Sequence, residues 1–181
     1  MLIRLLTELD LNAYSAMRLG GLQESPTAFG SSYEQESKFS PQDFASRIRP
    51  HGDPANGMYG AFGDSNQLMG TSGFSREHHL KRAHIGSVWG MYVLPEFRGK
   101  GIGAALLDEA LAHARRLPGL RQVTLTVTAG NLPAIGLYKS RGFERFGLQR
   151  DALLVDGHLY DEEHMALYLT PLSTPGPQIH P

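Results

Sequence analysis

The sequence predicts an α+β domain whose core is one mixed, mostly antiparallel sheet of about seven strands, flanked by about four helices. Three observations predict this class. Some segments alternate apolar and polar residues, as half-buried strands do, whereas others place apolar residues three or four positions apart, as helices do. Glycine, proline and asparagine stand at the boundaries between these segments. Their order is a strand, two helices, three strands, a helix, a strand, a helix and a hairpin.

The chain begins with a predicted strand and two predicted helices. Residues 2–7 have the pattern of a strand, and Asp10 stands where it can cap the first helix. Residues 24–48 predict a loop and then a short helix that begins at Pro41, because proline suits the first helical turn. The first part of the chain therefore supplies one strand and two helices.

Three strands are predicted in the middle of the chain, over residues 56–63, 67–75 and 85–94. The first two flank a turn of glycine, aspartate, serine and asparagine, which favours a hairpin. The third is apolar nearly throughout, which predicts a strand buried on both faces.

The second half predicts a long helix, a strand, a short helix and a hairpin. The long helix repeats apolar residues at a spacing of four and ends at Pro118 and Gly119. Residues 123–128 alternate as a strand does, and Asn131 can cap the helix that follows. Asp156 and Gly157 form a strong hairpin signal. We expect one domain over residues 1–169 and a proline-rich, disordered tail over residues 170–181.

Composition excludes several classes of function. The net charge is -1 and charged residues make up 19% of 181, so no basic field favours nucleic acid. The chain has no cysteine, which excludes disulfides, thiolate metal sites and a cysteine nucleophile. No segment approaches the roughly 20 apolar residues that cross a bilayer, and the first residues lack a secretory pattern. We expect a cytoplasmic protein that binds neither nucleic acid nor membrane.

Three alternating glycines at the start of the long helix predict an anion site. Gly99, Gly101 and Gly103 stand where alanine would stabilise a helix by roughly 1 kcal/mol each, so the backbone there must be approached closely. Exposed N–H groups beside the positive end of a helix dipole suit a phosphate or pyrophosphate. Arg98 and Lys100 add two positive charges. The alternative is a tight strand-to-helix turn with solubilising charges.

Two familiar phosphate motifs fit this stretch less well. A Walker loop needs a glycine five residues before its Gly-Lys pair, and residue 94 is a leucine. Gly99, Gly101 and Ala104 formally satisfy the dinucleotide pattern G-x-G-x-x-A. That motif belongs to a first strand-to-helix turn with an acidic residue after the next strand, and neither condition holds here. A nucleotide-linked reductase remains the weaker alternative.

Two motifs resemble those of the GCN5-related N-acetyltransferase (GNAT) family. "YVLPEFRGKGIGAALL" resembles its acetyl-CoA-binding signature R/Q-x-x-G-x-G/A, which Arg98, Gly101 and Gly103 fill. "NLPAIGLYKSRGFE" matches the pattern N-x-x-A-x-x-x-Y-x-x-x-G-F, with Asn131 at its first position and Tyr138 at its tyrosine. The two motifs stand in the family's order, separated by a helix and a strand. Together they are far more specific than either alone.

The resemblance implies α/β/α layers and a sheet that splays between its fourth and fifth strands. It implies that acetyl-CoA is the cofactor, with its pyrophosphate on the backbone of residues 99–104 and on Arg98, and its pantetheine arm paired with residues 91–93. By this resemblance the cofactor-binding residues are Met91, Tyr92, Val93, Arg98, Gly99, Lys100, Gly101, Ile102, Gly103, Ala104, Asn131 and Tyr138.

The resemblance also implies direct acetyl transfer to an amine in a ternary complex, without a covalent enzyme intermediate. Asn131, Ile135 and Tyr138 share a helical stripe that faces the cofactor sulfur in the family, so Tyr138 is the candidate general acid. The alternative is a packed core tyrosine. The backbone N–H of Met91 or Tyr92 is the candidate donor to the oxyanion.

The general base is left unassigned. Ser87 stands where some relatives carry a glutamate, and serine is too weak a base. His84, Glu77, Glu34 or water stay open. His78, His79 and His84 lack the carboxylate spacing of a metal site, and we expect no metal.

The acceptor is a primary amine of a small molecule or an amino acid by our first interpretation, and a protein N-terminus or lysine by the second. In the family, the first helices and the final hairpin shape the acceptor pocket. The residues this implicates are Phe29, Tyr33, Glu34, Trp89 and Tyr160. Acidic Glu34, Asp161 and Glu162 suit a cationic amine. A CoA-binding sensor without turnover is the alternative from another class, and a homodimer is the candidate assembly.

Overall fold

The computed structural model describes residues 1–49, 53 and 55–169. The tail predicted for residues 170–181 lies outside the described residues. All seven strands form one sheet in the order β1-β2-β3-β4-β5-β7-β6. The strands are β1 (Leu2–Leu5), β2 (Gly57–Phe62), β3 (Leu68–Arg76), β4 (Ile85–Val93), β5 (Gln122–Thr128), β6 (Glu144–Val155) and β7 (His158–Tyr168). All neighbouring pairs are antiparallel except β4 and β5, so the sheet is mixed, as predicted.

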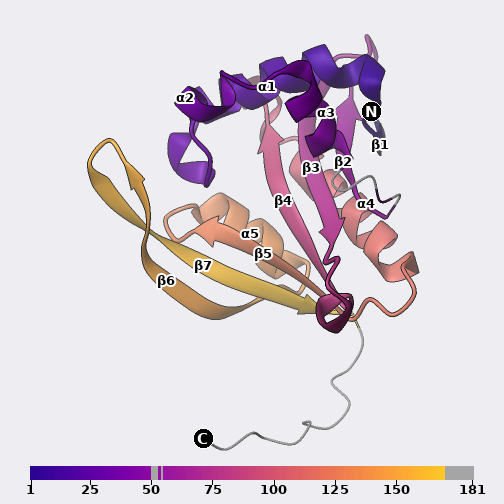
Figure 1. The fold of residues 1–181 in the computed structure, drawn as a ribbon, viewed down its shortest axis with the longest axis vertical. Coiled ribbons are helices and arrows are strands. Elements are labelled where there is room, and N and C mark those ends of the chain that lie inside the picture. The colour runs from indigo at the N-terminus through magenta and orange to yellow at the C-terminus, as the bar shows by residue number, and fades with distance from the viewer. Residues whose placement is uncertain (50–52, 54, 170–181) are drawn as a thin grey trace, which may run out of the picture.

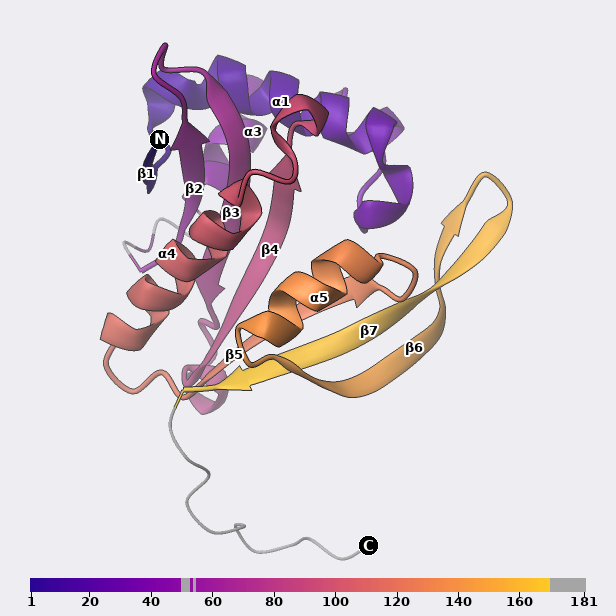
Figure 2. The same ribbon diagram turned by 180° about the vertical axis from the view of Figure 1, so that it is seen from behind.

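Helices cover both faces of the sheet and give the predicted α/β/α layers. They are α1 (Leu11–Glu24), α2 (Tyr33–Glu36), α3 (Pro41–Ile48), α4 (Ile102–Arg116) and α5 (Leu132–Ser140). The first three lie toward the viewer or across the end of the sheet in Figure 1. Figure 2, turned by half a revolution, brings α4 and α5 to the front. Each layer has its own buried cluster of apolar side chains.

Local signals explain most of these elements and two differences from the sequence interpretation. Ser40 and Asp43 form a capping box around Pro41, which fixes the start of α3 where it was predicted. α2 is a single turn capped by Ser32, too short to show a helical period, and it falls within the segment expected to be a loop. Asp10 precedes α1, yet its side chain makes no cap hydrogen bond, because it binds Arg4 instead.

β4 was expected to be buried on both faces, and this was only partly right: most of its residues are half-buried. The reason is that β4 pairs with β5 over three residues alone, Ile85 to Ser87 against Gln122 to Thr124. Beyond Ser87 the two strands diverge, as Figures 1 and 2 show, and they leave the splay that the family resemblance implied. Among the described residues, no strand therefore pairs with this edge in the second half of β4.

A β-bulge in this second half of β4 changes which residues face each layer. The register against β3 shifts around Gly90, whose φ is +59°. As a result Trp89 and Tyr92 both pack toward α1, although they are three residues apart, whereas Met91 packs toward α4 and α5. The sequence carried a weak signal of this bulge, a glycine inside an apolar strand.

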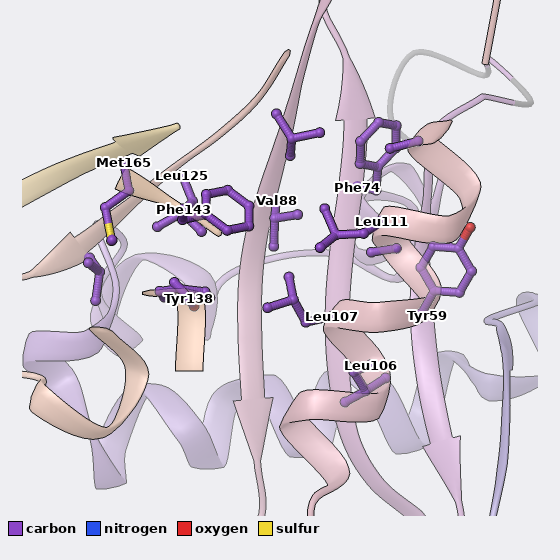
Figure 3. Close-up of a cluster of buried hydrophobic side chains, with 14 of the residues drawn as sticks. Tyr59, Phe74, Val88, Leu106, Leu107, Leu111, Leu125, Tyr138, Phe143 and Met165 are labelled. Atoms are coloured by element: carbon purple, nitrogen blue, oxygen red, sulfur yellow. The ribbon is translucent and has the colours of Figure 1, made fainter. Parts of the chain in front are cut away.

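The larger core lies between the sheet and the layer of α4 and α5. α4 contributes Leu106, Leu107 and Leu111, each at most 1% exposed. Figure 3 shows them facing the side chains of the sheet, with Tyr138 of α5 beside Phe143. This core fixes both helices that follow the splayed strands. In the part of the chain that is described, no helix has both the length and the apolar character needed to cross a bilayer.

A partly buried ion pair anchors the start of α1 and predicts an acid-sensitive stability. Asp10 accepts from Nη1 and Nη2 of Arg4 at 2.7 and 2.8 Å and from the Thr7 N–H at 2.8 Å. The Arg4 hydrogen bonds, aided by Thr7, lower the pKa of Asp10 from 3.8 to about 2 despite its burial. Because the folded pKa is the lower one, the stabilisation is present above about pH 4 and is lost as pH falls through about 2.

We therefore expect Asp10→Asn to lower the free energy of unfolding at pH 7 by about 2 kcal/mol. The difference between the variant and the wild type should vanish between about pH 4 and 2, which urea titrations at several pH values would measure. A difference that persists at pH 2 would contradict this account.

Candidate active site

A cleft of about 520 Å³ opens where β4 leaves β5. The cleft lies between the free edge of β4, the start of α4 and the start of α5. It brings together most of the residues that the resemblance implied for the cofactor: Met91, Tyr92, Val93, Arg98, Gly99, Gly101, Ile102, Gly103, Ala104 and Asn131. Sequence reasoning missed other residues of its lining, namely Ser25, Ala28, Phe97, Pro133 and Leu137.

The glycine loop has the backbone that its sequence predicted. Gly99 and Gly101 adopt φ angles of +73° and +77°, a region that L side chains rarely enter, and Gly101 is the residue that caps α4. A Cβ at either position would meet nothing within 4 Å, and both residues line the cleft. Gly103 lies inside the first turn of α4, where the N–H groups have no intrahelical acceptor.

The Arg98 guanidinium is already engaged in this structure. It donates to both carboxylate oxygens of Glu24 at 3.0 and 2.7 Å, and its Nε donates to the Val93 carbonyl at 3.0 Å. Tyr92 also donates its hydroxyl proton to Glu24, at 3.2 Å. These contacts tie the end of α1 to β4 and to the glycine loop. The hydrogen bonds from Arg98 are the main reason why the pKa of Glu24 is lowered to about 2.

Lys100 and Asn131 also make local contacts. The Lys100 ammonium donates to the Glu96 carbonyl at 3.0 Å, and Lys100 is not among the residues that line the cleft. The Asn131 side chain accepts from the Ala134 N–H at 3.2 Å and caps α5, as predicted. Asn131 also lines the cleft, so its side-chain amide nitrogen could donate a hydrogen bond to a ligand there.

Tyr138 stands behind the wall of the cleft. It is 7% exposed, packs edge to face against Phe143 at 5.9 Å between ring centroids, and points its hydroxyl at the Met91 sulfur, 3.7 Å away. Burial raises the pKa of Tyr138 to about 12, so the hydroxyl keeps its proton. Met91 lines the cleft, and the methionine side chain that contacts this hydroxyl is flexible.

A second cavity, of about 600 Å³, lies on the opposite face of the splayed strands. Phe29 and Trp89, both candidates for the acceptor site, belong to its lining. Gly90 also lines it, while the next residue of the strand, Met91, lines the first cleft. The two hollows therefore meet at the bulge of β4. Sequence reasoning missed Arg18, Arg47 and His164 in this lining, because three elements far apart in the chain bring them together.

The remaining acceptor candidates lie elsewhere. Tyr33 and Glu34 line a neighbouring cavity of about 620 Å³ between the α1–α2 connection and the β6–β7 hairpin, and Phe29 borders both cavities. Tyr160 lines neither of these two cavities. Asp161 accepts a backbone hydrogen bond from Asp151 at 2.9 Å, whereas Glu162 lines the cavity beside β4.

The candidates for a general base are dispersed. Ser87 lines the second cavity, and its hydroxyl lies 3.1 Å from the Thr124 hydroxyl, which is not a base. Glu77 pairs with Arg82 at 3.5 Å, and His84 is exposed outside that cavity. His164, which does line it, is the imidazole that the sequence interpretation did not consider.

Three consecutive residues after β3 bring side-chain atoms that can bind a metal close together. One ligand atom each from Glu77, His78 and His79 lies within 4.8 Å of the others, and His84 is not part of the group. Residues that are adjacent in sequence come this close without any help from the fold, so their proximity does not indicate a metal site. We retain the expectation of no metal.

The fold and the cavities define a class of protein: an α+β domain with a mixed, splayed sheet and one cavity on each side of the bulge of β4. The sequence profile of the acetyltransferase (GNAT) family matches residues 22–143, and the chain belongs to this family. The match includes both motifs on which the resemblance was based.

Relatives and solved structures agree with this membership. A mycothiol acetyltransferase of Geodermatophilus obscurus is 37% identical over 134 residues, which are 68% of this chain and 40% of the relative. The match thus covers less than half the length of that relative. A ribosomal-protein-alanine N-acetyltransferase from Brucella melitensis superposes with a TM-score of 0.80 at 22% identity, covering 93% of this chain and 99% of the other. A phosphinothricin acetyltransferase from Sinorhizobium meliloti in complex with AcCoA has a TM-score of 0.80, 22% identity, and coverage of 99% and 95%.

Proposed function

We propose that the chain is an acetyl-CoA-dependent N-acetyltransferase that acts on a primary amine of a small molecule. One observation carries this proposal: two hollows meet across the bulge of β4, one with the glycine loop at its end and one with polar and aromatic walls. Family membership supports the cofactor. A ternary complex needs such an arrangement, with the two reactants on either side of one strand.

The residues present fit acetyl-CoA. The open space at Gly99 and Gly101 and the free N–H groups of the first turn of α4 suit a pyrophosphate. Beyond Ser87, the edge of β4 on the side of β5 pairs with no strand in the part of the chain that the structure describes, and this edge suits an amide-bearing arm that adds like a strand. Bound acetyl-CoA would supply the thioester whose C–S bond breaks as the amine nitrogen bonds to the carbonyl carbon, with one proton passing from nitrogen to sulfur.

Groups of the protein would then position the thioester and stabilise the charge that develops on its carbonyl oxygen and its leaving sulfur. Backbone N–H groups at the bulge, on Met91 or Tyr92, would donate to the carbonyl oxygen. The Tyr138 hydroxyl would donate a hydrogen bond to the leaving sulfur. A tyrosine with a pKa of about 12 is a weaker acid than a thiol with a pKa of about 8.5, so complete transfer to a free thiolate is uphill by about 5 kcal/mol. The hydroxyl therefore acts first as a hydrogen-bond donor. It would give its own proton to the sulfur only while it takes up the proton that leaves the amine nitrogen.

Ligand-induced stabilisation tests the proposal most directly. We expect acetyl-CoA and CoA to raise the melting temperature, by an amount that corresponds to about 2.7 kcal/mol at 100 times the dissociation constant. NAD and NADP should have no such effect. Thiol release with a library of amines then tests turnover. A shift with NAD alone would overturn the proposal, and a CoA shift without turnover on any amine would favour the sensor interpretation.

The ion pair of Glu24 with Arg98 leads to a coupled prediction. Arg98→Ala should raise the dissociation constant of acetyl-CoA roughly tenfold, because a charge-assisted bond is worth about 1.5–3 kcal/mol. Glu24→Gln should lower it severalfold, because it frees the guanidinium and removes a negative charge beside the phosphates. Calorimetry on both variants and on the double variant measures the coupling. Weaker binding by Glu24→Gln would show instead that the pair serves to hold Arg98 in place.

A further inference from the structure

Two arginines from different helices converge on one buried carboxylate at the wall of the second cavity. Arg18 of α1 donates to Glu36 through Nε at 3.0 Å and Nη2 at 2.7 Å, and Arg47 of α3 donates through Nη2 at 2.8 Å. Glu36 belongs to the single turn of α2 and its side chain is fully buried. The contacts join all three helices of this layer.

The charges of this cluster do not balance. Within residues 1–49, 53 and 55–169, both guanidiniums form their ion pairs with the one carboxylate of Glu36. Arginine stays charged in proteins, so the cluster carries one net positive charge, and the Arg18 side chain is only 9% exposed. A charge held away from water is costly unless an anion meets it.

The unbalanced charge faces the second cavity. Arg18 and Arg47 both line it, and the Arg18 guanidinium lies 4.5 Å from the centre of the Phe29 ring, which lines it as well. The hydrogen bonds to Glu36 use three of the ten N–H donors that two guanidiniums carry. The fork of a guanidinium matches a carboxylate, so donors remain for a second carboxylate that enters from the cavity.

The β7 side of the same cavity carries a carboxylate and an imidazole. Glu162 lies on β7, beside Thr128 of β5, and His164 lies two residues further, beside Thr126. A carboxylate here suits an ammonium group, and an imidazole can accept a proton from it. Gly90, at the bulge where the two hollows meet, lines the cavity with them.

We infer that the acceptor is a small amine that also carries a carboxylate, which Arg18 and Arg47 bind while the amine lies toward β7 and the bulge of β4. The inference rests on the proposed function and narrows its substrate class. It makes Arg18 and Arg47 specificity-determining residues, and Glu36 the positioning residue that orients both.

A comparison of amino acids with their carboxamides tests this inference. Each pair differs only in the anionic group, and thiol release at a fixed acetyl-CoA concentration gives kcat/KM for both. We expect the carboxylate form to be preferred tenfold or more, with the difference mainly in KM. Carboxamides that react as well as the amino acids would overturn the inference and leave the proposed function standing.

Substitutions of Arg47 test whether this residue recognises the carboxylate. Arg47→Gln should reduce the preference for the carboxylate to near unity, whereas Arg47→Lys should keep part of it. Arg82→Gln is the matched control, since Arg82 lines the same cavity but pairs with Glu77, and it should keep the full preference. Loss of preference in Arg82→Gln with retention in Arg47→Gln would overturn the assignment.

Equilibrium binding separates this inference from the proposed function. The more buried Arg18 is left intact, and the melting temperature of Arg47→Gln without ligand checks its fold. In the presence of CoA, amino acids should raise the melting temperature of the wild type more than their carboxamides do. Absence of any carboxylate-specific shift overturns the inference whether or not the protein turns over, while a specific shift without thiol release contradicts only the proposed activity.

Discussion

Replacing Tyr138 by phenylalanine is expected to lower kcat by roughly 10²- to 10⁴-fold with nearly unchanged affinity for acetyl-CoA. The substitution keeps the ring that packs against Phe143 and removes only the hydroxyl, which lies 3.7 Å from the Met91 sulfur at the wall of the cleft. A donor that acts on the leaving sulfur matters in the transition state and hardly at all in binding. Steady-state kinetics and calorimetry on the one variant measure both quantities.

Tyr59→Phe provides a matched control. Tyr59 belongs to the same buried cluster as Tyr138, and burial likewise raises its pKa to about 12, but it is not among the residues that line the cleft. It should cost stability of about 1 kcal/mol or less and leave kcat unchanged. Equal turnover in both variants would reduce Tyr138 to a packing residue and leave solvent as the proton donor.

The raised pKa of Tyr138 also fixes the pH dependence. Burial favours the neutral hydroxyl, so the donor stays protonated until the pH approaches about 12. A tyrosine at its ordinary value of about 10 would instead give an alkaline fall in activity within the measurable range. We therefore expect no decline in kcat attributable to Tyr138 between pH 8 and about pH 10. A fall that is present in the wild type and absent in Tyr138→Phe would contradict the environment described for the hydroxyl.

The sequence predicted the fold well where patterns are local. Capping at Pro41 and Asn131, the alternation of residues 123–128 and the turn at Asp156 each fix an element over a few neighbouring residues. The position of β7 between β5 and β6 was not predicted, because strand order depends on packing between distant segments. The bulge at Gly90 was not predicted either, because one glycine in an apolar strand has several explanations.

In the candidate site, too, features set by neighbouring residues could be predicted, whereas contacts between distant segments could not. The glycine loop could be found because its function depends on backbone geometry that consecutive residues encode. The contact of Arg98 with Glu24 could not, because 74 residues separate them, and the same holds for Arg18 and Arg47 around Glu36. Ion pairs between distant segments leave no spacing in the sequence. This is why the cofactor side could be predicted in more detail than the acceptor side.

The second large effect is expected at Gly101, where valine should raise the dissociation constant of acetyl-CoA about 10²-fold. A Cβ at Gly101 meets nothing within 4 Å and Gly101 lines the cleft, so we expect a branched side chain to compete with the pyrophosphate for this space. Loss of one or two charge-assisted hydrogen bonds, at about 1.5–3 kcal/mol each, accounts for an effect of this size. Calorimetry with acetyl-CoA measures it directly.

Backbone strain must be separated from this blocking effect. The φ of Gly101 is +77°, so valine is strained there even without a ligand, at a cost of about 1–3 kcal/mol in stability. Gly157→Val is the matched control, because Gly157 has a φ of +78°, also faces open space, and lies in the β6–β7 turn away from the cleft. Both variants should lose similar stability, and only Gly101→Val should lose cofactor affinity. If Gly101→Val binds acetyl-CoA as tightly as Gly157→Val does, the glycines serve the turn into α4 and not the ligand.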